Sequence, residues 1–196
     1  MLLQAHRAPV APIASRVPLY LGLIAVELVL VWFVAIGIRA RGHHLIDLFG
    51  QRWNTWPRAA VDVVCVAATV ALLRAAGPIL YRFLGGWSSQ TGFLLPVSRA
   101  ESVVWIALSV AAGVCEELVY RGYLQRQLWS VTGNLPAALI LQAAIFSVGH
   151  IYQGWKPALV TGIYGLIFGL LAALRRSVVP GAIAHALADI IGGLRL

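Results

Sequence analysis

The chain has 196 residues, of which 60% are hydrophobic and only 11% are charged, and its mean hydropathy is +0.84. A soluble globular domain carries about 25% charged residues, so this composition excludes that class. The net charge of +8 comes almost entirely from arginines at the ends of apolar segments and between them. We therefore expect anionic lipid headgroups, and no nucleic acid, as the partners of this charge.

Long apolar segments recur along the chain, and each approaches the roughly 20 residues that a helix needs to cross the hydrocarbon of a bilayer. The first follows a polar N-terminal tail and runs from Pro18 to Ile38, with Glu27 as its one charged residue. The second begins near Ala59 and extends toward Leu84, but Arg74 and the Gly77–Pro78 pair predict a kink or an early end.

The third segment differs from the first two because ionisable residues occur inside it. Ser98 and Glu101 form the capping-box pattern that starts a helix. No strong helix breaker follows for many residues, so we expect this helix to reach about Trp129. Glu116 then lies near the middle of the helix and not at its end.

Three further helical segments are predicted after the third. A helix restarts at Asn134 and Pro136 and runs to about Ile151, and the spans 157–174 and 178–194 finish the chain. These segments predict an all-α, polytopic transmembrane bundle of about six spans with a buried polar active-site cavity. Residues 1–98 comprise the tail and the first two spans, and residues 99–196 comprise the catalytic core, within one integrated membrane domain.

Three pairs of residues with i to i+4 spacing lie inside the last four spans. They are Glu117 with Arg121, Phe146 with His150, and His185 with Asp189. This spacing places both members of a pair on one face of a helix. With a rise of about 1.5 Å per residue, all three pairs reach similar levels of the bilayer. We expect them to line one cavity, and ionisable groups inside spans favour a functional role.

The two adjacent glutamates are predicted to have different roles. Glu117 has Arg121 one helical turn later, so we expect a structural ion pair. Glu116 points about 100° away around the helix and has no local cation, which makes it the candidate general base. With His150 opposite, Glu116 would activate a water molecule for attack on a peptide carbonyl, and a donor from the last span would stabilise the oxyanion.

The three motifs together resemble those of a known family. They read EELVYR at 116–121, FSVGH at 146–150 and HALAD at 185–189. In order and spacing they are similar to the pattern Glu-Glu-x-x-x-Arg, Phe-x-x-x-His and His-x-x-x-Asn or Asp of the CPBP (CAAX protease and bacteriocin-processing, also called Abi) family. The resemblance implies an intramembrane endopeptidase similar to the CAAX prenyl endopeptidase. It also implies that Glu116 and His150 activate water, while His185 and Asp189 serve the oxyanion.

Asp189 stands where the prenyl endopeptidase pattern has Asn. An ionised Asp would repel an oxyanion, so Asp189 is expected either to be protonated or to orient His185. The departure also leaves a metal site open as an alternative, because Glu116, His150, His185 and Asp189 offer nitrogen and oxygen ligands for Zn²⁺. Family members have been described as metalloproteases, and both mechanisms remain open. We favour water activation without a required cofactor.

The predicted substrate is a membrane-associated protein or peptide, either prenylated or carrying a leader of the bacteriocin type. The predicted location is the plasma membrane, as a multi-pass protein. The alternative from a different class is a non-enzymatic transporter or immunity-type scaffold that uses the same buried charges to bind an ion or a partner. Inverted repeats or broken half-helices would favour a transporter, and neither is visible in the sequence.

Overall fold

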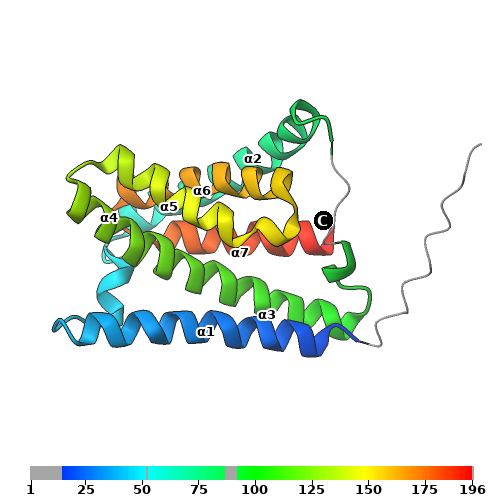
Figure 1. The fold of residues 1–196 in the computed structure, drawn as a ribbon, viewed down its shortest axis with the longest axis horizontal. Helices are drawn as coiled ribbons and strands as arrows, with labels where there is room; N and C mark the ends of the chain where they lie inside the picture. The colour runs from blue at the N-terminus through cyan, green and yellow to red at the C-terminus, as the bar shows by residue number, and fades with distance from the viewer. Residues whose placement is uncertain (1–14, 52, 87–91, 196) are drawn as a thin grey trace, which may run out of the picture.

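The protein forms an all-α bundle, as the sequence predicts (Figure 1). The computed structural model describes residues 15–51, 53–86 and 92–195, so most of the predicted N-terminal tail lies outside the described residues. The main helices are α1 (Val17–Arg39), α2 (Trp56–Phe83), α3 (Arg99–Glu116), α4 (Gln125–Thr132), α5 (Leu135–Gly149), α6 (Trp155–Arg175) and α7 (Val179–Leu194). The segment η3 (Glu117–Leu124) joins α3 to α4 without a break.

Six helical segments occupy the positions of the six predicted spans. Four of them are long and apolar enough to cross a membrane: α1, α2, the continuous segment 99–132, and α6. The other two, α5 and α7, are apolar but shorter, with 15 and 16 residues. These helices support the assignment as an integral membrane protein.

The starts of two helices follow the predicted capping residues. The side chain of Asn134 accepts a hydrogen bond of 2.9 Å from the backbone N–H of Ala137 at the start of α5. At the start of α3, Ser98 Oγ accepts from the backbone N–H of Glu101 at 3.2 Å. The carboxylate of Glu101 accepts in turn from the backbone N–H of Val97, at 2.8 Å, just before the cap. Local side chains therefore set both helix starts.

The second span ends close to the expected Leu84, and of the two alternatives predicted for the Gly77–Pro78 pair, a kink or an early end, the early end is wrong. Helix α2 continues through Pro78 and ends at Phe83. Pro78 has no N–H to donate to the carbonyl four residues earlier. The hydroxyl of Tyr164, on α6, donates to the carbonyl of Leu73, in the same turn, at 3.1 Å. Helix α6 therefore contacts α2 beside the turn that Pro78 weakens.

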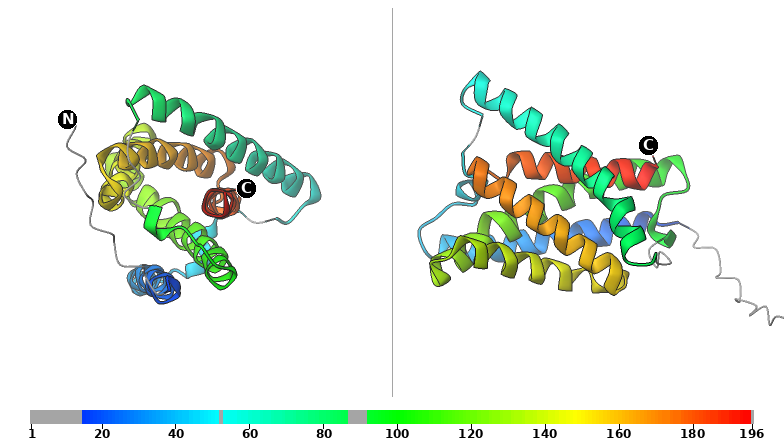
Figure 2. Two further views of the ribbon diagram at one scale, coloured as in Figure 1. Left: turned by 90° about the vertical axis from the view of Figure 1, so that its right-hand side faces the viewer. Right: turned by 90° about the horizontal axis from the view of Figure 1, so that it is seen from above.

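Helix α7 lies in the interior of the bundle, beside α3 on one side and α2 on another (Figure 2). Gly113 makes the close contact with α3 feasible. A Cβ atom at this position would lie 2.7 Å from the backbone nitrogen of Ala186 and 2.8 Å from the carbonyl oxygen of Ala182. Any larger residue would therefore push the two backbones apart. The approach matters because α3 carries Glu116 at its end and α7 carries His185.

Candidate active site

The two adjacent glutamates lie at the junction where α3 passes into a π-helix. Glu116 is the last residue of α3, and η3 runs from Glu117 to Leu124 with π-helical hydrogen bonding. The sequence predicts an ordinary α-helix here, because no residue in this segment marks a wider turn. π-Helical turns are rare and occur frequently at functional sites. Glu117 and Arg121 are both buried within this segment.

Glu117 and Arg121 form a fully buried ion pair. Arg121 Nη1 lies 2.8 Å from Glu117 Oε1, and neither side chain is exposed. Arg121 Nη2 also donates to the carbonyl of Gly165 on α6, at 3.3 Å. The guanidinium carbon lies 4.4 Å from the centroid of the Phe146 ring on α5. This one arginine therefore links three helical segments around the carboxylate of Glu117.

His185, on α7, lies between the two glutamates. Its Nδ1 atom is 3.3 Å from Glu117 Oε1, and its Nε2 atom is 3.7 Å from Glu116 Oε2. Nε2 is also 3.7 Å from Asp189 Oδ2, one turn later on the same helix. The ring stacks on Phe168 of α6 with a centroid separation of 5.1 Å. The orientation of this imidazole is therefore fixed from several sides.

His150 is held at the end of α5 by a bond that fixes its tautomer. It occupies the C-cap position, and its Nδ1 atom lies 2.9 Å from the carbonyl oxygen of Phe146. Because a carbonyl oxygen only accepts, Nδ1 must carry the hydrogen. In the neutral ring Nε2 then has a free lone pair, which is able to accept a proton.

Part of this group lines a cavity of about 380 Å³, whereas Glu117 is not among its lining residues and Arg121 lines a different cavity, so the expectation that all three pairs line one cavity is met only in part. Glu116, His150, His185 and Asp189 all line the first of these cavities, and they come from three different helical segments. The sequence places Glu116 opposite His150. Among the described residues, however, the recorded ion-pair contact of Glu116 is with His185, and His150 faces the same space without touching Glu116. The space between them has room for water and for a peptide carbonyl.

Glu27, on α1, is a site residue that the motif analysis misses. It lines the same cavity as Glu116. Glu27 Oε2 and Glu116 Oε2 are both buried without a hydrogen-bond partner in the described part of the chain, although Glu116 Oε2 has its ion-pair contact with His185. The signal in the sequence is its isolation, because Glu27 is the one charged residue inside an otherwise apolar span. Glu27 is not part of any of the three i to i+4 pairs that indicate the site in the sequence.

Asp189 is less enclosed than its neighbours. Its side chain is 41% exposed, and the contact recorded for its carboxylate is the one with His185 Nε2. The geometry is compatible with the predicted orienting role, in which the carboxylate holds the imidazole ring. That role and the alternative of a protonated Asp189 both stay predictions.

The predicted zinc alternative finds no ready site in this arrangement. Within residues 15–51, 53–86 and 92–195, no group of three His, Cys, Asp or Glu side chains is placed to hold a metal ion. The alternative of a metal site therefore gains no support from this arrangement and stays a prediction. No step proposed below depends on a metal.

A comparison with known families identifies the same region of the chain. Residues 98–191 match the family model described as "Type II CAAX prenyl endopeptidase Rce1-like". The match begins at the N-cap of α3 and ends in α7, so it includes all six predicted site residues and leaves out α1 with Glu27. No curated protein and no solved structure matches the chain.

Proposed function

Because residues 98–191 form a domain of the Rce1-like family of type II CAAX prenyl endopeptidases, we propose that this membrane protease cleaves a peptide bond with water activated by Glu116 and His150. The single observation that carries the proposal is the convergence of Glu116, His150, His185 and Asp189 on one cavity. Burying four ionisable groups inside an apolar bundle costs free energy, and packing alone would be served better by apolar side chains.

The first step is the attack of water on the peptide carbonyl. The water molecule lies between the carboxylate of Glu116 and the lone pair of His150 Nε2, which accept hydrogen bonds from it. As the water oxygen bonds to the carbonyl carbon, its proton passes to Glu116. The carbonyl oxygen becomes an oxyanion, and the carbon becomes tetrahedral.

His185 is the proposed donor to the oxyanion. Both of its ring nitrogens face carboxylate oxygens, which only accept, so both contacts are satisfied when both nitrogens carry hydrogen. An imidazolium ring at the cavity wall then offers its Nε2–H to the developing negative charge. Asp189 keeps the ring oriented from one side, and Glu117, fixed by Arg121, keeps it oriented from the other.

Collapse of the tetrahedral species completes the reaction. The C–N bond breaks, the oxyanion reforms a carbonyl, and the proton held by Glu116 passes to the leaving amine. The products are a carboxylic acid, which keeps the second hydrogen of the water until it ionises, and a new amine. No covalent enzyme intermediate is needed, because water is the nucleophile.

The proposed substrate is a membrane-associated protein or peptide, and the proposed location is the plasma membrane. The family supports a substrate of this general kind. We propose that the substrate carries its anchor close to the cleaved bond, because the catalytic groups lie within helices long enough to span the bilayer. Matched peptides with and without a prenyl group, reconstituted with the enzyme in vesicles, distinguish a prenylated substrate from an unmodified leader.

The test of the mechanism is cleavage of a membrane-anchored fluorogenic peptide by the purified protein in vesicles. Glu116→Gln and His150→Ala are each expected to lower kcat by about 10²–10⁴-fold, the usual contribution of a general base. Glu101→Gln, a buried glutamate away from the cavity, and His43→Ala, an exposed histidine, are matched controls. If folded Glu116→Gln and His150→Ala proteins cleave as fast as the parent, the proposal is wrong and a non-enzymatic role is favoured.

A further inference from the structure

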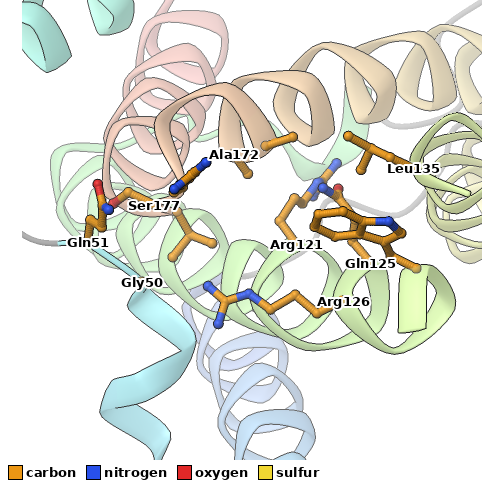
Figure 3. Close-up of a pocket in the computed structure, with 12 residues that line it drawn as sticks. Gly50, Gln51, Arg121, Gln125, Arg126, Leu135, Ala172 and Ser177 are labelled. Carbon is orange, nitrogen blue, oxygen red and sulfur yellow. The ribbon is translucent and has the colours of Figure 1, made fainter. Parts of the chain in front are cut away.

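A second cavity, of about 490 Å³, lies at the end of the bundle where α4 and α6 terminate (Figure 3). It shares no lining residue with the catalytic cavity. Helix α6 and the segment 99–132 are both long enough to span a membrane, so their common end lies at a membrane–water interface. The cavity therefore opens at the depth of lipid headgroups.

The lining of this cavity is positively charged. It contains Arg121, Arg126 and Arg176 and no aspartate or glutamate. Arg121 is already neutralised by Glu117. The other two are exposed residues, and within the described ranges neither makes an ion pair. The cavity thus offers two cationic groups to a ligand.

Arg126 is held in place and keeps unused donors. It donates from Nη1 to the carbonyl of Asp47 at 2.9 Å and from Nη2 to the carbonyl of Leu48 at 3.1 Å, both in the short helix η1 (Leu45–Phe49). A guanidinium carries five N–H donors, so three remain for a ligand. Because the side chain is already ordered, binding an anion costs little further conformational entropy.

The position of Arg176 is also fixed by neighbouring backbone. Its φ angle is +50°, in the left-handed region that non-glycine residues seldom adopt. The backbone N–H of Gln51 donates to its carbonyl at 2.8 Å, and the N–H of Val178 donates to the carbonyl of Phe49 at 3.1 Å. Two backbone hydrogen bonds therefore join the end of η1 and the residues after it to the α6–α7 connection. No side-chain hydrogen bond of Arg176 occurs within the described residues, so its guanidinium is available.

A buried acceptor lines the same cavity. Gln125 is 5% exposed, and its Nε2 donates to the carbonyl of Gly169 at 3.1 Å, whereas its Oε1 is buried without a partner among the described residues. An unsatisfied buried acceptor is costly, and a hydroxyl group of a ligand would satisfy it. Apolar side chains such as Leu135 and Ala172 complete the wall. The cavity thus combines cationic groups, a hydrogen-bond acceptor and apolar surface.

We propose that this cavity binds one anionic phospholipid with a hydroxylated headgroup, of the phosphatidylglycerol class. The phosphate lies between Arg126 and Arg176, a headgroup hydroxyl donates to Gln125 Oε1, and the acyl chains leave along the apolar helix surfaces. Basic pockets between transmembrane helices bind anionic headgroups in this way. Inorganic phosphate offers the same charge but lacks the acyl chains that the membrane setting of the cavity favours.

The test is lipid retention by the full-length protein in detergent, measured by native mass spectrometry during titration with phosphatidylglycerol or phosphatidylcholine. The parent protein is expected to retain one phosphatidylglycerol and no phosphatidylcholine. At about 1 kcal/mol per basic group, Arg176→Gln should weaken binding about 5-fold, and the Arg126→Gln/Arg176→Gln double variant about 30-fold. Arg39→Gln is the matched control, because Arg39 is an exposed arginine at the end of α1.

Three outcomes would overturn the proposal. They are equal retention of the two lipids, equal loss of binding in the Arg39→Gln control, and displacement of the lipid by inorganic phosphate at a similar concentration. Size-exclusion elution and thermal unfolding of each variant establish that it is folded. If Arg126→Gln disturbs η1, the comparison of Arg176→Gln with Arg39→Gln decides the question. The readout is lipid retention, so the result is independent of peptidase activity.

Discussion

His185 Nε2 lies 3.7 Å from Glu116 Oε2, across the interface between α7 and α3. The same imidazole reaches Glu117 through its other nitrogen, at 3.3 Å. One histidine therefore contacts both of the adjacent glutamates, although these point to different sides of their helix. Glu117, fixed by Arg121, orients the ring, and Glu116 lines the cavity together with it. The predictions below test the parts of this arrangement separately.

Arg121→Met is expected to destabilise the protein by about 3–5 kcal/mol. The substitution leaves the carboxylate of Glu117 buried without its cation, which is the usual cost of breaking a buried ion pair. Unfolding in a denaturing detergent, followed by circular dichroism, measures the change. The Arg121→Met/Glu117→Leu double variant removes both charges and should recover much of the loss. A single variant as stable as the parent would show that the pair contributes little.

Gly113→Ala is expected to lower both stability and activity. The new Cβ would lie 2.7 Å from the backbone nitrogen of Ala186, and backbone does not yield as a flexible side chain does. The added methyl group should cost about 1–3 kcal/mol and displace His185 from Glu116. Thermal unfolding and kcat measure the two effects. Gly22→Ala in α1 is the control, since nothing lies within 4 Å of that position, and an equal loss there would contradict the explanation.

Glu27→Leu is expected to lower kcat/KM about tenfold, because it removes a polar side chain from the cavity that Glu116 lines. Glu27→Gln keeps an amide that is able to donate to the Glu116 carboxylate, so it should recover most of the activity. Cleavage of the anchored peptide by both variants gives the comparison. Val26→Ala, at a neighbouring exposed position, serves as the control. Equal activity of the leucine and glutamine variants would argue against a polar role for Glu27.

Treatment with a metal chelator is expected to leave the cleavage rate unchanged. No group of three His, Cys, Asp or Glu side chains in the described part of the chain is placed to hold a metal ion, and the proposed water activation uses Glu116 and His150 alone. Rates measured before and after dialysis against the chelator, with metal content determined on the same samples, test this expectation. Loss of activity that added Zn²⁺ restores would instead support the metalloprotease alternative.

Several features of the fold could be predicted from the sequence because they depend on local chemistry. Asn134 and Ser98 cap their helices as expected, since a side-chain oxygen two or three residues away satisfies a free N–H. Whether α2 continues through Pro78 could not be decided in the same way, because the local pattern allowed a kink or an early end. The hydrogen bond from Tyr164 to the carbonyl of Leu73 comes from another helix.

The sequence by itself determined the pairing within each helix. Glu117 with Arg121 and His185 with Asp189 follow from the i to i+4 spacing, because this spacing fixes which side chains share a helix face. Only the tertiary structure decided which helices face one another. The close approach of α7 to α3 at Gly113 places His185 beside Glu116, and the packing of α1 brings in Glu27. Helix-to-helix distances depend on surface shape, which no local pattern specifies.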